Sequence, residues 1–357
     1  MKDLIIDANF PRTQDGRVYH LGIKAGEVAN RIVTVGAPSR AQKIATLLDP
    51  KPKPFALSTE RGFLTITGRY KSVPVSIVSI GMGNPNVDFF IREVRECLSG
   101  DLVVVRLGSC GALVDVKVGT IVIPSGSIAV NRNYDYDFLN GGAAGEEPYR
   151  FSKRVNVDQE LQSKIVSALE QTRPPSLHSA IVTNTLNAST DSFYSSQGRI
   201  TSFPDHNAGL IDHLKSLYPD LATFEMETYH LLHLAASWPA RSRPTSSATP
   251  PLSSFPARLE ISDPDTPSHQ AHQAPPNTVE VTAGTDGHDL VPRPAIRAAA
   301  AQMVFAARGS RDFITPGQVE AIEAWCSKGT LEALISFPLA SERMHPESGS
   351  VWEVLNV

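Results

Sequence analysis

Two glutamates one residue apart, Glu225 and Glu227, are the first residues in this sequence that point to chemistry. They lie in the otherwise apolar stretch ATFEMETYHLL, residues 222–232. A buried carboxylate is costly unless another group pairs with it or donates hydrogen bonds to it. The alternative is that both carboxylates lie on the solvated first turn of a helix, where negative charge is favoured. The rest of the chain has to decide between these two interpretations.

Three arginines stand beside glycine turns: Arg40 in VGAPSR, Arg61 in TERGFL and Arg106 in VVRLGSCG. A turn that presents backbone N–H groups next to a guanidinium is a natural phosphate site, because the planar fork of arginine matches phosphate oxygens. Arg106 also ends an apolar run, where an unpaired charge is costly, so a structural ion pair with Glu225 or Glu227 is the alternative. Taken together, the three arginines predict an anion site.

A third candidate feature is an aromatic residue followed by an amide and a guanidinium. In NASTDSFYSSQGRITSF, residues 187–203, Phe193 is followed by Gln197 and Arg199. An aromatic face can stack on a nucleobase, while the amide and the guanidinium can hydrogen-bond to the edge of that base. This pattern is weak evidence by itself, because many polar loops offer similar groups.

The glycine turns follow short β-branched runs, which predict strands. The expected strands are residues 31–38, 74–83, 101–111 and 119–126. Apolar residues at helical spacing predict helices between them, at 39–49 and 86–98. This alternation indicates an α/β fold with a mixed, mainly parallel central sheet flanked by helices. Ligands gather at the carboxyl ends of the strands in such sheets, so the turns are expected to share one site.

The composition of the sequence changes at Trp238. Residues 238–294 are rich in proline, serine and threonine and show no apolar period. Such a segment cannot bury enough surface to offset its ordering entropy, so we expect a disordered insert. The expected organisation is an N-terminal tail, residues 1–17, and one domain formed by residues 18–237 and 295–357.

Globular patterning returns beyond the insert. Residues 296–313 are expected to supply the last core strand, although their four consecutive alanines suit a helix equally well. A helix is predicted at 315–335, with Thr315 as its N-cap and Pro316 at its first helical position.

The composition excludes several classes of protein. The 357 residues carry a net charge of -4, and no apolar run approaches the length of about 18 residues that a membrane helix needs. We therefore expect neither a nucleic-acid nor a membrane partner. Three cysteines without a CxxC motif argue against a disulfide framework or a zinc site and favour the cytoplasm. His230 and His233 lack a third ligand, so no metal is expected.

Five fragments in order give the chain a resemblance to the nucleoside phosphorylase family, and within it to the uridine phosphorylases. The fragments are YHLGI, VGAPSR with AQKIA, RLGSCGAL with VGTIVI, DSFYSSQGR and FEMET. The similarity covers residues 18–237 and resumes more weakly at 297–335. It implies reversible phosphorolysis of uridine to uracil and ribose 1-phosphate, with phosphate as co-substrate and no cofactor.

The resemblance also implies a role for each matching residue. The phosphate site would consist of Gly36, Arg40, Arg106 and Ser109, with Arg61 supplied by a neighbouring subunit. The ribose site would consist of Met226 and Glu227, with Glu225 beside them and His20 from the neighbour. The uracil site would consist of Phe193, Gln197, Arg199 and, in the closing loop, Arg308, with Arg311 as the alternative. Arg106, Glu227 and Arg199 would act most directly on the reaction.

Sharing of residues between subunits implies a homodimer or a ring of dimers. The sequence departs from the family pattern at Ala37 and Ser39, where aspartates are usual, and at Gly62, where some relatives place a glutamate for an ion. The enzymatic alternatives are a purine nucleoside phosphorylase and a nucleosidase on the same fold. A nucleoside-binding protein without activity is the alternative from another class.

Overall fold

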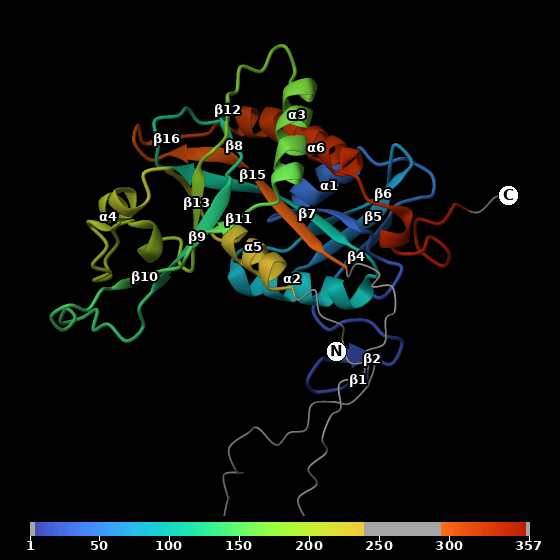
Figure 1. Cartoon of the computed structure of the whole chain (residues 1–357), viewed down its shortest axis with the longest axis horizontal. Coiled ribbons are helices and arrows are strands. Elements are labelled where there is room, and N and C mark those ends of the chain that lie inside the picture. The colour runs from blue at the N-terminus through green and yellow to red at the C-terminus, as the bar shows by residue number, and fades with distance from the viewer. Residues whose placement is uncertain (1–3, 239–293, 355–357) are drawn as a thin grey trace, which may run out of the picture. The chain divides into compact units, whose positions relative to one another are not determined.

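Runs of valine and isoleucine form the centre of the sheet in the computed structural model, which describes residues 4–238 and 294–354 (Figure 1). Four strands lie parallel there, in the order β15, β7, β3, β6. Their bounds are β3 (Arg31–Val35), β6 (Val73–Ser79), β7 (Leu102–Ala112) and β15 (Ile296–Ala307). The predicted insert lies almost wholly outside the described residues.

A second parallel set joins the sheet at the carboxyl end of β7, beyond the end of β3 and on the side opposite β15. It contains β9 (Gly126–Arg132), β13 (Leu186–Thr190) and β14 (Leu221–Glu225). β14 pairs with the last residues of β7 in antiparallel fashion, Thr223 opposite Ala112. The carboxyl ends of the two parallel sets therefore meet. This arrangement confirms the predicted α/β class with a mixed, mainly parallel sheet.

Short strands complete the sheets. Beyond β6, β5 (Leu64–Tyr70) and β4 (Phe55–Ser58) follow in antiparallel order. The remaining strands of the large sheet are β8 (Ile121–Val122), β10 (Tyr149–Phe151), β11 (Val155–Asn156), β12 (Ile181–Val182) and β16 (Asp312–Phe313). A separate two-stranded sheet consists of β1 (Ile5–Ile6) and β2 (Arg12–Thr13).

Helices cover both faces of the large sheet (Figure 1). One face carries α1 (Pro38–Ala45), α3 (Gln159–Thr172) and α6 (Pro316–Ser336); the other carries α2 (Asn84–Cys97) and α5 (Thr228–Ser237). α4 (Leu210–Leu217) packs beside β14 in a smaller apolar cluster. Thr315 caps α6 together with Gln318 in a capping box, as the sequence predicts for its start. No helix in residues 4–238 and 294–354 is both long and apolar enough to cross a bilayer.

Residues 296–307 form a strand although their alanines favour a helix in isolation. β15 pairs with β7 over its whole length, with Ala300 opposite Arg106. Tertiary pairing overrides the intrinsic preference because both neighbours of β15 supply backbone partners. Four predicted ends are wrong. The strands expected at 31–38 and 74–83 end at Val35 and Ser79, before their glycine turns. The strand expected at 119–126 is only β8, which ends before Pro124, and the helix expected at 39–49 ends at Ala45.

Candidate active site

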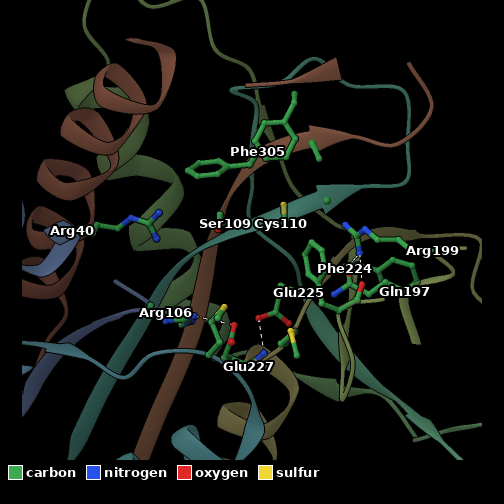
Figure 2. A pocket seen from close by; sticks show the side chains of 17 residues that line it. Arg40, Arg106, Ser109, Cys110, Gln197, Arg199, Phe224, Glu225, Glu227 and Phe305 are labelled. Atoms are coloured by element: carbon green, nitrogen blue, oxygen red, sulfur yellow. Dashed lines mark hydrogen bonds and ion pairs between the residues drawn. The ribbon is translucent and has the colours of Figure 1, made fainter. Parts of the chain in front are cut away.

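The ends of the two parallel sets enclose a cavity of about 210 Å³ (Figure 2). Most of the predicted site residues line it: Gly36, Arg40, Arg106, Ser109, Phe193, Gln197, Arg199, Glu225, Met226 and Glu227. Arg40 lies at one end of the cavity and Arg199 with Gln197 at the opposite end, while Glu227 lies between them (Figure 2). The cavity therefore has a cationic end, a carboxylate in the middle and an amide–guanidinium end.

Arg106 and Glu227 form a buried ion pair that joins the cationic end of the cavity to its middle. Arg106 Nη2 lies 2.9 Å from Glu227 Oε2, and both side chains are less than a tenth exposed. The backbone N–H of Gly83, a residue with φ of 92°, donates to the other carboxylate oxygen at 2.6 Å. Among the described residues, Nε and Nη1 of Arg106 have no hydrogen-bond partner. Because buried donors are normally satisfied, these two nitrogens suit an anionic ligand.

Arg40 is held at the cationic end by an acid from the far end of the chain. Its Nε donates to Glu323 Oε1 at 2.8 Å, and Lys43 donates to Glu323 Oε2 at 3.0 Å. The guanidinium also lies 5.7 Å from the ring centre of Phe305 in β15. Ser109 is exposed toward the cavity, whereas Gly108 and Cys110 on either side of it in β7 are buried. The strands and helices thus direct two guanidiniums and a hydroxyl to one place.

Glu323→Gln is expected to flatten the acid side of the stability profile. Burial raises the pKa of Glu323, but the hydrogen bonds from Arg40 and Lys43 outweigh it and bring the pKa below 4.5. A lowered pKa in the folded state stabilises the fold above pH 4.5, and this contribution is lost as the pH falls through the lowered value. Urea unfolding from about pH 3 to pH 7 should show wild type and variant converging at low pH. Glu320→Gln, an exposed change on the same helix, is the control, and a wild-type advantage that persists at low pH would contradict the assignment.

At the opposite end, Gln197 and Arg199 are fixed against each other. Arg199 Nη1 donates to Gln197 Oε1 and to the carbonyl oxygen of Phe193, and its guanidinium lies 3.8 Å from the centre of the Phe193 ring. Gln197 Nε2 donates to Thr190 Oγ1 at 3.0 Å. A guanidinium has no acceptor, so the amide oxygen has to face Arg199. One N–H and one lone pair of the amide are left for a ligand.

Arg308 lies next to this pair. Its Nη1 and Nη2 lie 2.9 Å and 3.3 Å from the backbone carbonyl oxygens of Gln197 and Gly198, respectively. Burial and the nearby charge of Arg308 lower the pKa of Arg199 to about 10, so Arg199 stays a cation at neutral pH. Arg311 has a positive φ of 66° at the turn before β16. The structure therefore places Arg308, the first candidate for the closing loop, beside Gln197, although Arg308 is not one of the residues that line the cavity.

Glu225 has no free oxygen for a sugar. Asn187 and Ser189 donate to its Oε1, while the backbone N–H groups of Glu227 and Thr228 and the hydroxyl of Thr228 donate to its Oε2. Burial and the neighbouring Glu227 raise the pKa of Glu225, and these donors oppose that shift. Glu225 thus holds the turn from β14 into α5. The structure answers the question of the paired glutamates, because one supports the turn and the other faces the cavity.

His20 and Arg61 lie outside the cavity of their own chain. Both contact Tyr19: the His20 ring packs edge-on at 5.0 Å, and the Arg61 guanidinium lies 4.2 Å from the ring centre. His20 is held by Glu93, whose Oε1 lies 2.6 Å from its Nδ1, and by stacking on Phe89 at 3.8 Å. The two residues predicted to act in a neighbour's site therefore gather in one cluster.

Sequence reasoning missed several residues of the cavity and its supports. Met82, Phe224, Phe305 and Phe313 line the cavity without any local signal, and Phe313 is 72% exposed. Gly83 stands in GMGNPN, residues 81–86, which the sequence predicts to be a tight turn near the sugar, without indicating its hydrogen bond to Glu227. Cys110 also lines the cavity, and burial raises the pKa of its thiol.

Comparisons with known proteins place the chain in a family. Residues 30–238 match the model of the phosphorylase superfamily. A uridine phosphorylase of Thermococcus kodakarensis is 29% identical over 239 residues, which are 66% of this chain and 78% of that one. A DeoD-type purine nucleoside phosphorylase of Oceanobacillus iheyensis is 36% identical over 109 residues, 30% of this chain and 45% of its own length.

Solved structures agree with the sequence matches. A structure from a study of two uridine phosphorylases of the oomycete Phytophthora capsici has a TM-score of 0.74 at 34% identity, covering 94% of this chain and 100% of that one. The nucleoside phosphorylase of Trypanosoma brucei shares the fold at 19% identity, with a TM-score of 0.64 and 92% of this chain covered. The chain therefore belongs to the phosphorylase superfamily and is a pentosyltransferase of the nucleoside phosphorylase type.

Proposed function

We propose that the protein catalyses the reversible phosphorolysis of uridine to uracil and ribose 1-phosphate. The observation that carries this proposal is the order of groups along one cavity: Arg40 and Arg106 at the cationic end, Glu227 in the middle, and Gln197 with Arg199 at the far end (Figure 2). Phosphate, ribose and a uracil edge require groups of these kinds in this order. Phosphate at the Arg106 end lies on the opposite side of the sugar from the departing base.

The reaction follows from this arrangement. A phosphate oxygen attacks C1′ while the bond from C1′ to N1 of uracil breaks, through a sugar with oxocarbenium character. Arg40, Arg106 and Ser109 bind the hydrogen phosphate, and Glu227 accepts hydrogen bonds from the ribose hydroxyls and so sets the attack geometry. The bonding electrons pass to uracil, where Gln197 and Arg199 stabilise the charge that develops on its oxygens. The proton of the phosphate ends on uracil N1.

The other predicted residues fit the same proposal in supporting roles. Gly36 contributes to the phosphate end, where a Cβ would lie 3.7 Å from Arg106 Nη2. Met226 borders the sugar, Phe193 packs on the base, and Arg308 reinforces the base end. Glu225 supports the ribose site through the turn.

We also propose that Arg61 and His20 complete the phosphate and ribose sites of a neighbouring subunit in a homodimer or a ring of dimers. Their clustering on Tyr19, outside the cavity of their own chain, supports this exchange. Because the three cysteines are buried and unpaired, we place the enzyme in the cytoplasm.

Uracil release from uridine by the full-length chain tests the proposal directly. We expect release that depends on phosphate, with inosine a poor substrate because an amide and two guanidiniums serve a pyrimidine edge. Preference for inosine would instead favour a purine nucleoside phosphorylase. The DeoD-type relative, whose sequence match covers 30% of this chain, belongs to that branch. Equal release without phosphate would point to a nucleosidase. Failure with every nucleoside, together with measurable binding, would leave an inactive nucleoside-binding protein.

A further inference from the structure

A closed ring of buried polar side chains lies directly behind the ribose carboxylate. We call it the buried polar ring; its members are Asn187, Thr223, Glu225, Thr228 and Gln302, all 6% exposed or less. It joins β13, β14, α5 and β15, elements from both sides of the undescribed segment. Gln302 is its most distant member in sequence and stands between four alanines and Met303 in a mainly apolar strand.

The hydrogen bonds of Gln302 have only one consistent orientation. Thr228 Oγ1 donates to Glu225 Oε2 at 2.9 Å, because this oxygen already accepts from two backbone N–H groups and so acts as an acceptor. The amide nitrogen of Gln302 therefore donates to Thr228 Oγ1, at 3.2 Å, and its carbonyl oxygen faces Thr223 Oγ1, at 2.7 Å. Thr223 also lies 3.0 Å from Asn187 Oδ1, and its one hydroxyl proton serves one of these two acceptors at a time.

The two partners of Gln302 stand on either side of the turn that carries the paired glutamates. Thr223 precedes Glu225 by two residues and Thr228 follows it by three, so one amide side chain spans the whole turn. Glu225 in turn accepts from the backbone N–H of Glu227 at 2.9 Å and from that of Thr228 at 2.9 Å. The direction of the Glu227 side chain, toward Gly83 and Arg106, depends on this turn.

The simplest explanation of a buried glutamine is that its amide is hydrogen-bonded within the core and has no other role. In that case, replacing Gln302 would change only the stability of the fold. The hydrogen-bonded connection from Gln302 to Glu225 predicts an effect on substrate binding as well. Of the phosphate end, Gly36, Arg40 and Ser109 lie outside this turn, and only Arg106 is tied to it, through its ion pair with Glu227. A change in the ring should therefore disturb the sugar site more than the phosphate site.

We propose that Gln302 is a positioning residue, which fixes the Glu225–Thr228 turn so that the Glu227 carboxylate meets the ribose hydroxyls. The proposal rests on the proposed function, because it assigns Glu227 to the sugar. β15 then has a second task besides pairing with its neighbouring strands. The side chain at position 302 has to offer a hydrogen-bond donor to α5 and an acceptor to β14.

Gln302→Met, which keeps the length and removes both polar atoms, is the direct test in the full-length enzyme. We expect KM for uridine to rise about three- to tenfold, as for a lost hydrogen bond, with KM for phosphate changed less than about twofold. The preference for uridine over 2′-deoxyuridine should shrink by a similar factor, because the deoxysugar lacks one of the hydroxyls that Glu227 binds. A stability effect alone moves neither ratio.

Thr228→Val breaks the ring from the other side and keeps the test available where Gln302→Met does not fold. Its effect on KM for uridine should match that of Gln302→Met, the double variant should add little, and Thr228→Ser should restore wild-type kinetics. Thr67→Val is the matched control: this buried hydroxyl lies in β5, bonds to Ser76 at 2.7 Å and is remote from the cavity. It should lower stability without changing either KM.

Binding of ribose 1-phosphate, followed by calorimetry, separates this proposal from the choice of base. A wild-type enzyme that binds ribose 1-phosphate but ignores uridine would refute the uracil assignment, and weaker binding by Gln302→Met would still support the positioning role. The proposal is overturned where Gln302→Met and Thr228→Val behave like Thr67→Val, with lower stability and unchanged sugar affinity and deoxyuridine discrimination.

Discussion

Exchange of Arg106 for methionine is expected to lower kcat/KM for uridine phosphorolysis by about a thousandfold. The guanidinium serves two functions at once: Nη2 holds Glu227 at 2.9 Å, and Nε and Nη1 are buried without a partner among the described residues. Methionine removes the anion donors and leaves the carboxylate of Glu227 unpaired. Steady-state kinetics with each substrate varied in turn should therefore show losses for phosphate and for uridine.

Loss of one partner of a buried ion pair also destabilises the fold, by about 3–5 kcal/mol, so stability has to be separated from catalysis. The double variant Arg106→Met with Glu227→Gln removes both charges and should recover much of that stability without recovering activity. Arg31→Met is the matched control, since Arg31 is equally buried but donates to the backbone carbonyls of Leu334 and Phe337 at 3.0 Å and 3.3 Å. A single Arg106→Met enzyme within tenfold of wild type would refute the assigned role.

Local signals in the sequence are sufficient for much of the fold. The β-branched runs that end in glycine predict β3, β6 and β7, and Thr315 with Pro316 predicts the start of α6. Such signals act over a few residues, so one sequence is enough to detect them. β15 is different, because its alanines are compatible with both a strand and a helix. Only its pairing with β7, nearly 200 positions earlier in the sequence, makes this segment a strand.

The site shows the same division between local and distant information. Arginine beside glycine and the paired glutamates are visible as patterns, and resemblance to the family orders them. Glu323 looks like an ordinary helical acid in GQVEAIEAWC, yet it orients Arg40 from 283 residues away. Gln302 looks out of place in a strand, and nothing near it in sequence reveals Thr223 or Thr228 as partners. These contacts follow from the order of strands, which no short motif encodes.

Arg199→Met is expected to reduce kcat for uridine about a hundredfold, because the guanidinium shares the charge that develops on the departing base. It lies at the base end of the cavity, stacked at 3.8 Å on Phe193, and remains charged at neutral pH since its pKa is about 10. The dependence on the leaving group makes the prediction specific. Fluorine on the base withdraws electrons, so 5-fluorouridine has a better leaving group and should lose much less rate in the variant.

The comparison of the two nucleosides distinguishes charge stabilisation from positioning. If the variant only misplaces the base, the rates for uridine and 5-fluorouridine fall equally. If it removes the counter-charge, the rate for uridine, which has the poorer leaving group, falls more. Arg132→Met supplies the matched control, because Arg132 also stacks on a phenylalanine, Phe138 at 4.1 Å, and pairs with Asp205 at 3.2 Å away from the cavity. It should leave the ratio of the two rates at the wild-type value. Equal losses for uridine and 5-fluorouridine in Arg199→Met would contradict charge stabilisation and leave Arg199 as a residue that orients Gln197. The charge of the leaving base would then need another partner, and Arg308, which donates to the backbone of Gln197, would be the candidate.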